Sequence, residues 1–180
     1  RDNNSFLCFA GNGFICKGVD LVVESFLKNP TKKLHICGPS NEPAFWNEYG
    51  EKIKNAPNIT YHGFIQPGEK VFNSLASKCS YVVFHSASEG CCTSVATAMR
   101  AGLVPIINKW TGILVDECII ELNEDGDLVE NITTAVNQAS QIPPSDYSSL
   151  VASVIKKSNL FSQESFSNSY GEALDIVERT

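Results

Sequence analysis

The sequence predicts a single α/β domain in which a doubly wound parallel sheet is covered by helices on both faces. Apolar runs of strand length alternate along the chain with amphipathic stretches of helix length. The strand-like runs are almost continuously apolar, which is typical of parallel strands buried between two layers of helices. With 180 residues, 43% of them hydrophobic and 19% charged, the chain is long enough for one compact domain with its own core. Right-handed crossovers between such strands then produce the doubly wound arrangement.

The first two elements show the pattern on which this prediction depends. The run SFLCFAG at 5–11 reads as a buried strand that ends at a glycine. The stretch GVDLVVESFLKN at 18–29 repeats its apolar residues at the spacing of one helical face, and Pro30 ends it. The same two patterns predict further strands at 33–38, 58–64, 80–86 and 103–108, and helices at 42–56, 68–78 and 91–101.

The pattern weakens beyond residue 115. Residues 116–140 predict one short strand and one helix, and the prolines within 141–151 mark a turn before a further helix. The stretch 162–179 has apolar residues at helical spacing, and Ser162 and Ser165 loosely match a capping box at its start. We therefore expect a C-terminal helix.

Composition and charge argue against several classes of function. A net charge of −6 disfavours a protein that binds nucleic acid along its phosphates. No apolar run approaches the roughly 18–20 residues that cross a bilayer, and no signal peptide is visible. The chain starts with Arg1 rather than Met, so we expect it to be a piece of a longer protein.

The cysteines and histidines predict packing rather than metal binding. The seven cysteines are odd in number and form no C-x-x-C pair, which favours a reduced, cytosolic protein. Cys8 and Cys37 lie in apolar runs, where a thiol packs as a small hydrophobic group. The adjacent Cys91 and Cys92 could bind a soft metal or be redox-active, but they lack ligand partners at suitable spacing, so we expect no metal site. The histidines are expected to pack at strand ends, at His35, His62 and His85.

Most of the unusual residues fall in loops that follow the predicted strands. In an open parallel sheet, ligands bind beyond the carboxyl ends of the strands. The first such loop, GNGFICKG at 11–18, resembles a phosphate-binding loop because its glycines permit close backbone approach and Lys17 supplies charge. It lacks the G-K-[ST] ending of a P-loop, and Cys16 replaces the third glycine of G-x-G-x-x-G. A tight turn with a surface lysine is the alternative.

The second such loop is SEGCCTS at 88–94. Its small residues lead into a helix start, where free backbone amides attract anions and let a ligand come close. Glu89 could accept hydrogen bonds from sugar or ribose hydroxyls. The alternative is that Glu89 only stabilises the positive end of the helix dipole.

An ordered set of segments resembles the nucleotide-sugar-binding, C-terminal half of retaining glycosyltransferases of the group 1 type. These segments are FLCFAGNGFICKGVDLVVESF, HICGPS, ITYHGFI and SASEGCCTSVATAMRAGLVPII, and they cover roughly residues 5–113. FSQESFSNSYGEALDI also resembles the last helix of the family. The resemblance implies a Rossmann-like domain, one half of the two-domain GT-B fold, which needs no metal or other cofactor. It also implies that an N-terminal acceptor domain is missing from these residues.

Carried over residue by residue, the resemblance implies a donor site. Lys17 would meet the donor diphosphate, with Asn12 and Gly13 in the same loop. Gly63, Phe64 and Ile65 would border the base. Glu89 would contact the donor sugar as the candidate catalytic residue, although no protein nucleophile can be named. The amides that would face sugar and phosphate are those of Gly90, Cys91, Cys92, Thr93 and Ser94.

Two positions depart from the family pattern. Asn12 stands where the family commonly has an arginine, which removes a bidentate phosphate contact. Thr97 stands where the family has a second glutamate that holds the ribose, and a threonine hydroxyl makes a weaker, uncharged hydrogen bond. Either the donor is held differently, or its affinity is low, or the domain no longer catalyses.

The resemblance therefore implies the donor-binding domain of a retaining, bacterial-type hexosyltransferase that moves a sugar from a nucleotide-sugar to a polysaccharide or glycolipid. We expect it at the cytoplasmic face of the membrane, with peripheral membrane association of the full-length protein, and we expect these residues alone to transfer no sugar. Two alternatives stay open. One is a degenerate or regulatory domain that binds nucleotide or sugar without turnover, and the other is half of a nucleotide-sugar epimerase.

Overall fold

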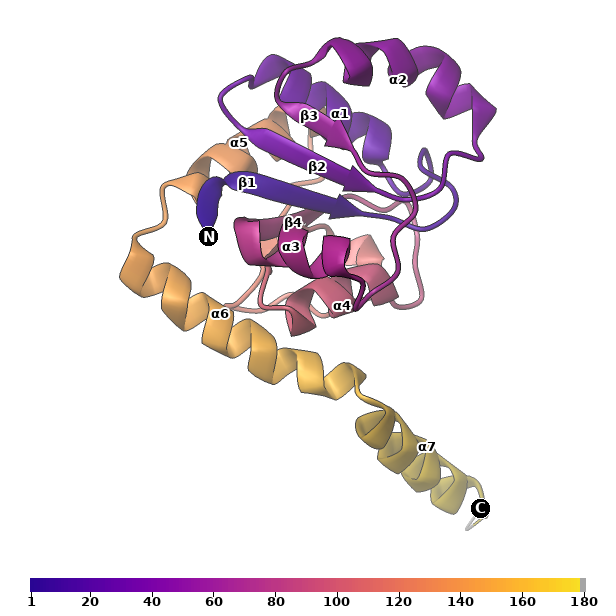
Figure 1. Cartoon of the computed structure of the whole chain (residues 1–180). Coiled ribbons are helices and arrows are strands. Elements are labelled where there is room, and N and C mark those ends of the chain that lie inside the picture. The colour runs from indigo at the N-terminus through magenta and orange to yellow at the C-terminus, as the bar shows by residue number, and fades with distance from the viewer. Residues whose placement is uncertain (179–180) are drawn as a thin grey trace.

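The computed structural model describes residues 1–178 and contains one six-stranded sheet, in which paired strands run parallel (Figure 1). The strand order is β3-β2-β1-β4-β5-β6. The strands are β1 (Asp2–Phe9), β2 (Lys33–Cys37), β3 (Ile59–Tyr61), β4 (Cys79–Phe84), β5 (Val104–Ile107) and β6 (Ile120–Glu121). The predicted doubly wound α/β fold is confirmed.

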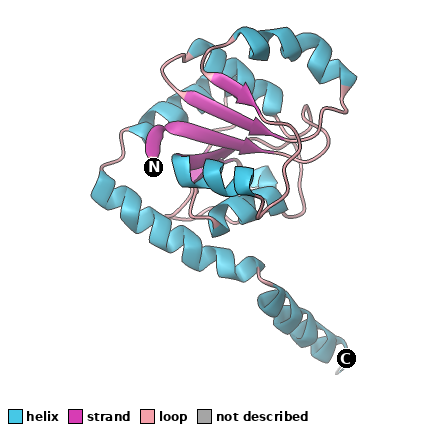
Figure 2. Ribbon diagram, viewed as in Figure 1, coloured by secondary structure: helices cyan, strands magenta, loops and turns pink. Residues whose placement is uncertain are grey.

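Helices lie on both faces of this sheet (Figure 2). On one face α1 (Val19–Lys28) contacts α2 (Pro43–Asn55) and α5 (Leu128–Ser140). Helix α3 (Lys70–Lys78) contacts β1 and β4, and Figure 1 shows it in front of the sheet, with α1 and α5 behind. Helix α4 (Thr93–Arg100) contacts α6 (Pro144–Ser158). The sheet is therefore enclosed, which explains why its strands are apolar on both sides.

The strand order reverses between β1 and β4. From β1 the chain proceeds outward to β2 and β3, and it then returns to β4 and proceeds the other way to β5 and β6. The loops that follow β1 and β4 consequently diverge, which opens a crevice beyond the carboxyl ends of these two strands.

Aromatic rings hold the two strands at this reversal together. Phe6 of β1 is fully buried, and its ring centroid lies 5.3 Å from that of Phe26 in α1 and 5.2 Å from that of Tyr81 in β4. The Tyr81 hydroxyl donates a hydrogen bond to the carbonyl of Ala139 in α5, at 2.5 Å. This packing ties β1 and β4 to α1 and α5 in the core of the domain.

The cysteines of the apolar runs are buried as the sequence predicts, and His62 and His85 follow strands as expected, whereas His35 lies in the middle of β2 rather than at its end. Cys8 and Cys37 are fully buried, and none of the seven cysteines, all of which lie in the described part of the chain, forms a disulfide. His85 is buried after β4. His35 and His62 are half-buried side by side, with Nδ1 of the first 3.0 Å from Nε2 of the second.

The ends of the predicted elements differ from the observed ones by a few residues. β1 begins at Asp2 rather than at residue 5. The strand predicted at 58–64 contains only Ile59–Tyr61, because Gly63 turns the chain with a φ of 78°.

Helix α7 (Gln163–Glu178) follows a short 3-10 turn (Asn159–Phe161) and extends away from the sheet (Figure 1). The Ser162 hydroxyl accepts the hydrogen bond of the Ser165 amide at 3.1 Å, as the capping pattern predicts. The predicted helix also included residue 179, which lies outside the described residues. None of the helices within residues 1–178 is long and apolar enough to cross a membrane.

Candidate functional site

The loop after β1 is pressed against the end of β4 by a glycine. Gly18 has a φ of 62°, and a Cβ placed there would lie 2.1 Å from the carbonyl oxygen of His85. The amide of Ala87 also donates a hydrogen bond to the carbonyl of Cys16, at 2.9 Å. Only glycine permits this approach, so the position of Lys17 is fixed relative to the loop after β4.

The loop after β4 is in turn tied to the loop after β5. The amide of Glu89 donates to the carbonyl of Trp110 at 2.8 Å, and that of Cys92 to the carbonyl of Thr111 at 2.9 Å. Gly112 has a φ of 70°, and a Cβ there would lie 2.3 Å from the carbonyl oxygen of Gly90. The backbone around Glu89 is therefore held on both sides.

A buried asparagine joins the same two loops at their base. Asn108 accepts a hydrogen bond from the Ser86 amide through Oδ1, at 3.1 Å, and donates one to the Ser86 carbonyl through Nδ2, at 2.8 Å. Both residues have no exposed surface. The side-chain amide of Asn108 and the backbone groups of Ser86 thus satisfy each other where β4 and β5 part.

These loops enclose a cavity of about 260 Å³ beyond the carboxyl ends of β1 and β4, which we name the loop cavity. Most of the residues predicted for the donor site line it. The lining residues are Phe9, Ala10, Gly11, Lys17, Phe64, Ile65, Pro67, Glu89, Cys91, Cys92, Thr93, Ser94 and Thr97.

Four of the predicted site residues do not line the loop cavity. Asn12 accepts a hydrogen bond from the side-chain amide of Asn41 at 3.0 Å, which holds it against the loop after β2. Gly13 and Gly63 both have positive φ and form the turns that carry the lining residues. The Gly90 carbonyl packs against Gly112. These residues shape the loops that surround the cavity.

Lys17 and Glu89 form an ion pair with each other, from the Lys17 ammonium to Oε1 of Glu89. Their side chains are only 20% and 21% exposed. The Lys17 ammonium also lies 5.9 Å from the centre of the Phe84 ring. Among the residues that the structure describes, no other charged side chain lines the loop cavity. The site therefore contains one cation and one anion, in contact.

The start of helix α4 forms one wall of the loop cavity. The helix begins at Thr93, so the amides of its first turn have no partners within the helix and its positive dipole end faces the ligand space. The Thr97 hydroxyl donates to the Thr93 carbonyl at 2.8 Å, one turn earlier in α4. Thr97 thus lines the loop cavity, but the hydrogen of its hydroxyl is already used in a hydrogen bond within α4.

The two cysteines of this wall are poor nucleophiles. Burial, together with the nearby Glu89 carboxylate, raises the pKa of the Cys91 thiol. Burial likewise raises the pKa of the Cys92 thiol. Both thiols are consequently protonated at neutral pH, whereas thiol nucleophiles and metal ligands react as thiolates. Within residues 1–178, no three His, Cys, Asp or Glu side chains are placed to hold a metal ion.

The comparison with known families agrees with this arrangement. The model of the family "Glycosyl transferases group 1" matches residues 1–142 of the chain. The chain belongs to the group 1 glycosyltransferases. No curated protein sequence matches it significantly.

Solved structures show which part of a group 1 glycosyltransferase this fold represents. The chain superposes over its whole length on 37% of a chain of the GtfA/B complex, with a TM-score of 0.76 and 13% identity. Of the chain, 97% matches 48% of HepE from Anabaena, solved with UDP and glucose, with a TM-score of 0.75 and 14% identity. It thus spans about a third to a half of these two chains.

A third structure is nearly matched in full. The chain superposes over 86% of its length on 82% of the C-terminal domain of LpcC, a group 1 family glycosyltransferase from Francisella tularensis, with a TM-score of 0.64 and 20% identity. The fold of the chain is therefore that of the Rossmann-like C-terminal domain of GT-B glycosyltransferases, as the sequence predicts.

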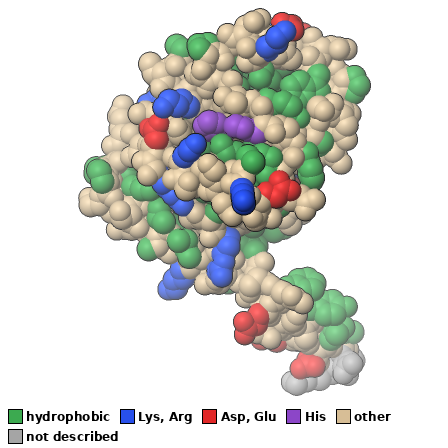
Figure 3. All heavy atoms as spheres, viewed as in Figure 1, with side chains coloured by type: hydrophobic (Ala, Val, Ile, Leu, Met, Phe, Trp, Pro, Cys, Tyr) green, Lys and Arg blue, Asp and Glu red, His purple; other side chains and the backbone are tan. Residues whose placement is uncertain are grey.

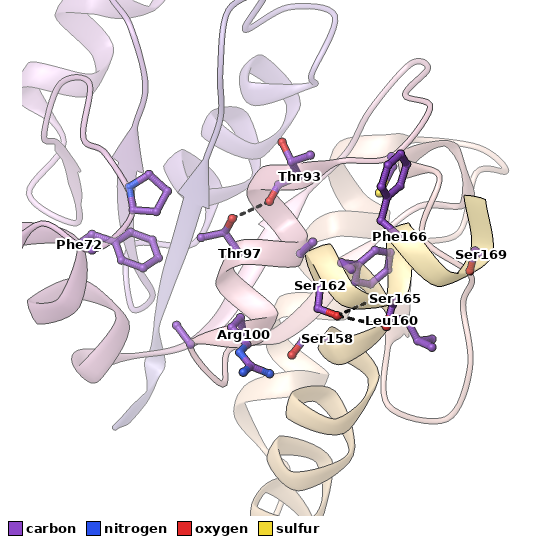
Figure 4. A pocket seen from close by; sticks show the side chains of 16 residues that line it. Phe72, Thr93, Thr97, Arg100, Ser158, Leu160, Ser162, Ser165, Phe166 and Ser169 are labelled. Carbon is purple, nitrogen blue, oxygen red and sulfur yellow. Dashed lines mark hydrogen bonds between the residues drawn. The ribbon is translucent and has the colours of Figure 1, made fainter. Parts of the chain in front are cut away.

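A larger groove of about 750 Å³ adjoins the loop cavity, and the sequence did not predict it (Figure 4). We name it the tail groove because Leu160, Phe161 and Phe166, from the 3-10 turn and α7, line it opposite Phe72 of α3. Arg100 is the one charged residue among its described lining residues. The two hollows share Pro67, Cys91, Thr93 and Thr97.

The tail groove escaped prediction because its walls come from segments that only tertiary packing brings together. Phe72 and Phe166 belong to two helices whose apolar spacing indicates a buried face, but not which partner each face meets. Pro67 was nearly predicted, because it lies two residues after Ile65, the last of the residues expected to border the base.

Proposed function

We propose that this chain is the single donor-binding domain of a retaining hexosyltransferase that uses a nucleotide-sugar. The observation that carries the proposal is the loop cavity. Lys17, Glu89 and the first turn of α4 meet there, at the reversal point of a parallel sheet, where ligands of such folds bind.

In this function each wall of the loop cavity serves one part of the donor. Lys17 and the amides at the start of α4 bind the diphosphate, since both present positive charge to the same space. The exposed ring of Phe64, with Ile65, borders the base. Thr97 lies near the ribose. Glu89 accepts hydrogen bonds from sugar hydroxyls.

The chemistry in this function is metal-independent. The carboxylate of Glu89 orients the sugar, and the donor phosphate helps its own departure because cationic groups stabilise the charge that develops on it. The protonated Cys91 and Cys92 thiols do not attack the sugar. The acceptor, a polysaccharide or glycolipid, attacks on the face that preserves the configuration.

Transfer requires a second, acceptor-binding domain, and α7 offers a surface for it. Phe166, Tyr170 and Leu174 are spaced four residues apart and are 69%, 58% and 47% exposed. Figure 3 shows hydrophobic and acidic side chains on this helix. Its 16 residues contain no lysine or arginine, which favours a protein surface over anionic lipid. The free cysteines support a reducing, cytoplasmic location, with membrane attachment through other parts of the full-length protein.

The test has two stages. Calorimetric titration of this chain with UDP-glucose, GDP-mannose and ADP-glucose should reveal binding of one donor, and the full-length protein should then transfer that sugar to an oligosaccharide or undecaprenyl-linked acceptor with retained configuration. This chain alone should transfer nothing. Failure to bind any nucleotide-sugar would contradict the proposal.

A second candidate is a domain that binds nucleotide or sugar without turnover. It is favoured by Thr97, whose hydroxyl is engaged by Thr93, and by Asn12, which lies outside the loop cavity. Tight binding with no transfer by the full-length protein would support it. Epimerisation of the donor without an acceptor would instead support a nucleotide-sugar epimerase.

A further inference from the structure

The ion pair in the loop cavity joins the two residues that would serve different parts of the donor. Lys17 would serve the diphosphate and Glu89 the sugar, yet the Lys17 ammonium contacts the Glu89 carboxylate directly. Both side chains are about four-fifths buried, and no other described residue of the lining carries a charge. Neither group has another charged partner within the loop cavity.

A diphosphate that binds at Lys17 must therefore compete with Glu89. If it draws the ammonium away, the carboxylate loses its partner in a sheltered site and also faces added negative charge. A buried group that loses its partner carries a desolvation cost, which is larger when the group is charged. A nucleotide diphosphate offers no hydroxyl groups in the sugar position, so it cannot relieve that cost.

A nucleotide-sugar can give new partners to both members of the ion pair. Its diphosphate binds the ammonium of Lys17, while its sugar hydroxyls donate hydrogen bonds to the carboxylate that Lys17 has left. Hydrogen bonds to an ionised acceptor are roughly twice as strong as those between neutral groups. Both members of the ion pair then have new partners.

The surrounding backbone prevents the loops from relieving the competition by moving apart. The Glu89 amide is bonded to the Trp110 carbonyl. The Ala87 amide donates a hydrogen bond to the Cys16 carbonyl at 2.9 Å, which joins the loops after β4 and β1. The Lys17 amide is bonded to the Gly13 carbonyl at 3.0 Å. The ligand must consequently replace the ion pair by moving only the side chains of Lys17 and Glu89, without separating the loops.

We propose that the Lys17–Glu89 ion pair makes the loop cavity select a nucleotide diphosphate that carries a sugar over the same nucleotide diphosphate without one. This inference rests on the proposed function and adds a specificity device to it. The pair favours release of the product, because the product lacks the sugar that satisfies Glu89. Glu89 thus acts both as a sugar contact and as a competitor of the free nucleotide.

The test compares matched ligands by calorimetric titration of this chain. The pairs are UDP with UDP-glucose, GDP with GDP-mannose and ADP with ADP-glucose, and the pair that wild type binds is used throughout. Glu89→Gln should bind the free diphosphate about 3- to 10-fold more tightly, because it releases Lys17. The same substitution should weaken the nucleotide-sugar, so the preference for the sugar-bearing ligand falls.

Two further variants make the result specific. In the double variant Lys17→Gln, Glu89→Gln, the diphosphate should bind no more tightly than to Lys17→Gln alone, since no ammonium remains to be released. Glu130→Gln is the matched control, because it removes a carboxylate from an ion pair with Lys28, which is exposed and remote from the loop cavity. It should leave the affinity for both ligands unchanged.

The outcomes separate this inference from the proposed function. Unchanged or weaker diphosphate binding by Glu89→Gln overturns the inference alone, as does a gain that persists without Lys17, which would show simple repulsion by Glu89. Absence of binding to wild type by every ligand contradicts the proposed function, and the inference with it. Circular dichroism checks folding, and Glu89→Ala replaces Glu89→Gln if the latter does not fold.

Discussion

In the loops around the loop cavity, glycines with positive φ and buried hydrogen bonds fix each turn against its neighbour, whereas α7 extends from the domain with its apolar side chains exposed. The loops are stabilised by contacts with one another, within the domain. The helix has apolar surface that the described domain does not cover. From this difference we expect substitutions in the loops to change the stability of the domain and the proposed donor binding, and substitutions on the exposed side of α7 to change neither.

The largest effect is expected from a methyl group added at the closest contact between the loops. Gly18→Ala should lower the free energy of unfolding by about 3–5 kcal/mol, because the new Cβ would collide with the His85 carbonyl at a φ that alanine disfavours. Gly171→Ala in α7 is the matched control. A Cβ there meets nothing within 4 Å, so this variant should be more stable by up to about 1 kcal/mol. Urea denaturation measures both, and equal effects would refute the contrast.

The next effect concerns binding at the loops. Lys17→Ala should weaken binding of the nucleotide diphosphate by about 1.5–3 kcal/mol, the usual loss for a hydrogen bond to a charged group. The unfolding free energy should fall by no more than about 1 kcal/mol, since the ion pair with Glu89 is lost at a partly sheltered site. Calorimetry and thermal denaturation give the two values. A large loss of stability with unchanged binding would show that Lys17 is structural.

A smaller effect on the free energy of unfolding should come from the pH titration of His35 and His62. Burial, with a contribution from His62, lowers the pKa of His35 to about 4, and burial also lowers the pKa of His62. An unfolded histidine titrates near 6.5, so the unfolded chain binds more protons and stability is lost as pH falls from about 6.5 towards 4. We expect a loss of about 1–2 kcal/mol by about pH 4.5, allowing for the partial exposure of the rings.

The variant His35→Gln, His62→Gln isolates this effect from the titration of carboxylates. Its unfolding free energy should depend less steeply on pH than that of wild type between about pH 6.5 and 4.5. Parallel curves for the two proteins would show that the histidine pair does not contribute.

The smallest effect is expected in the tail. Tyr170→Ser with Leu174→Ser should change the unfolding free energy of this chain by less than about 0.5 kcal/mol, because both side chains are exposed. Donor affinity should also be unchanged. In the full-length protein the same substitutions should lower the transfer rate, because the proposed contact with the acceptor domain is weakened. A marked destabilisation of this chain would show that α7 already packs within it.

The elements of the sheet could be predicted because buried parallel strands and amphipathic helices leave strong periodic patterns. The end of β3 could not, because it depends on the turn at Gly63 and on pairing with β2. Periodicity specifies which segment forms a strand, while its last residue is decided by tertiary hydrogen bonds.

For the candidate site, too, the location could be predicted but the side-chain contacts could not. Parallel strands end at a common edge, so Lys17 and Glu89, in two loops after strands, could be expected at one site. Their direct ion pair could not be predicted, because it depends on side-chain direction and on the contact between Gly18 and His85. Asn12 was assigned to the site by its place in the loop, yet its amide partner Asn41 lies in another loop.

The clamp between Asn108 and Ser86 has a consequence for which side chains the chain tolerates where β4 and β5 separate. The side-chain amide of Asn108 offers one donor and one acceptor, as a peptide group does, and it meets both backbone groups of Ser86. It therefore acts as an extra rung of the ladder between β4 and β5, supplied by a side chain instead of a main chain. A side chain at position 108 without this donor and acceptor would leave the buried amide and carbonyl of Ser86 without these partners, so the point where the two strands separate depends on one side-chain amide.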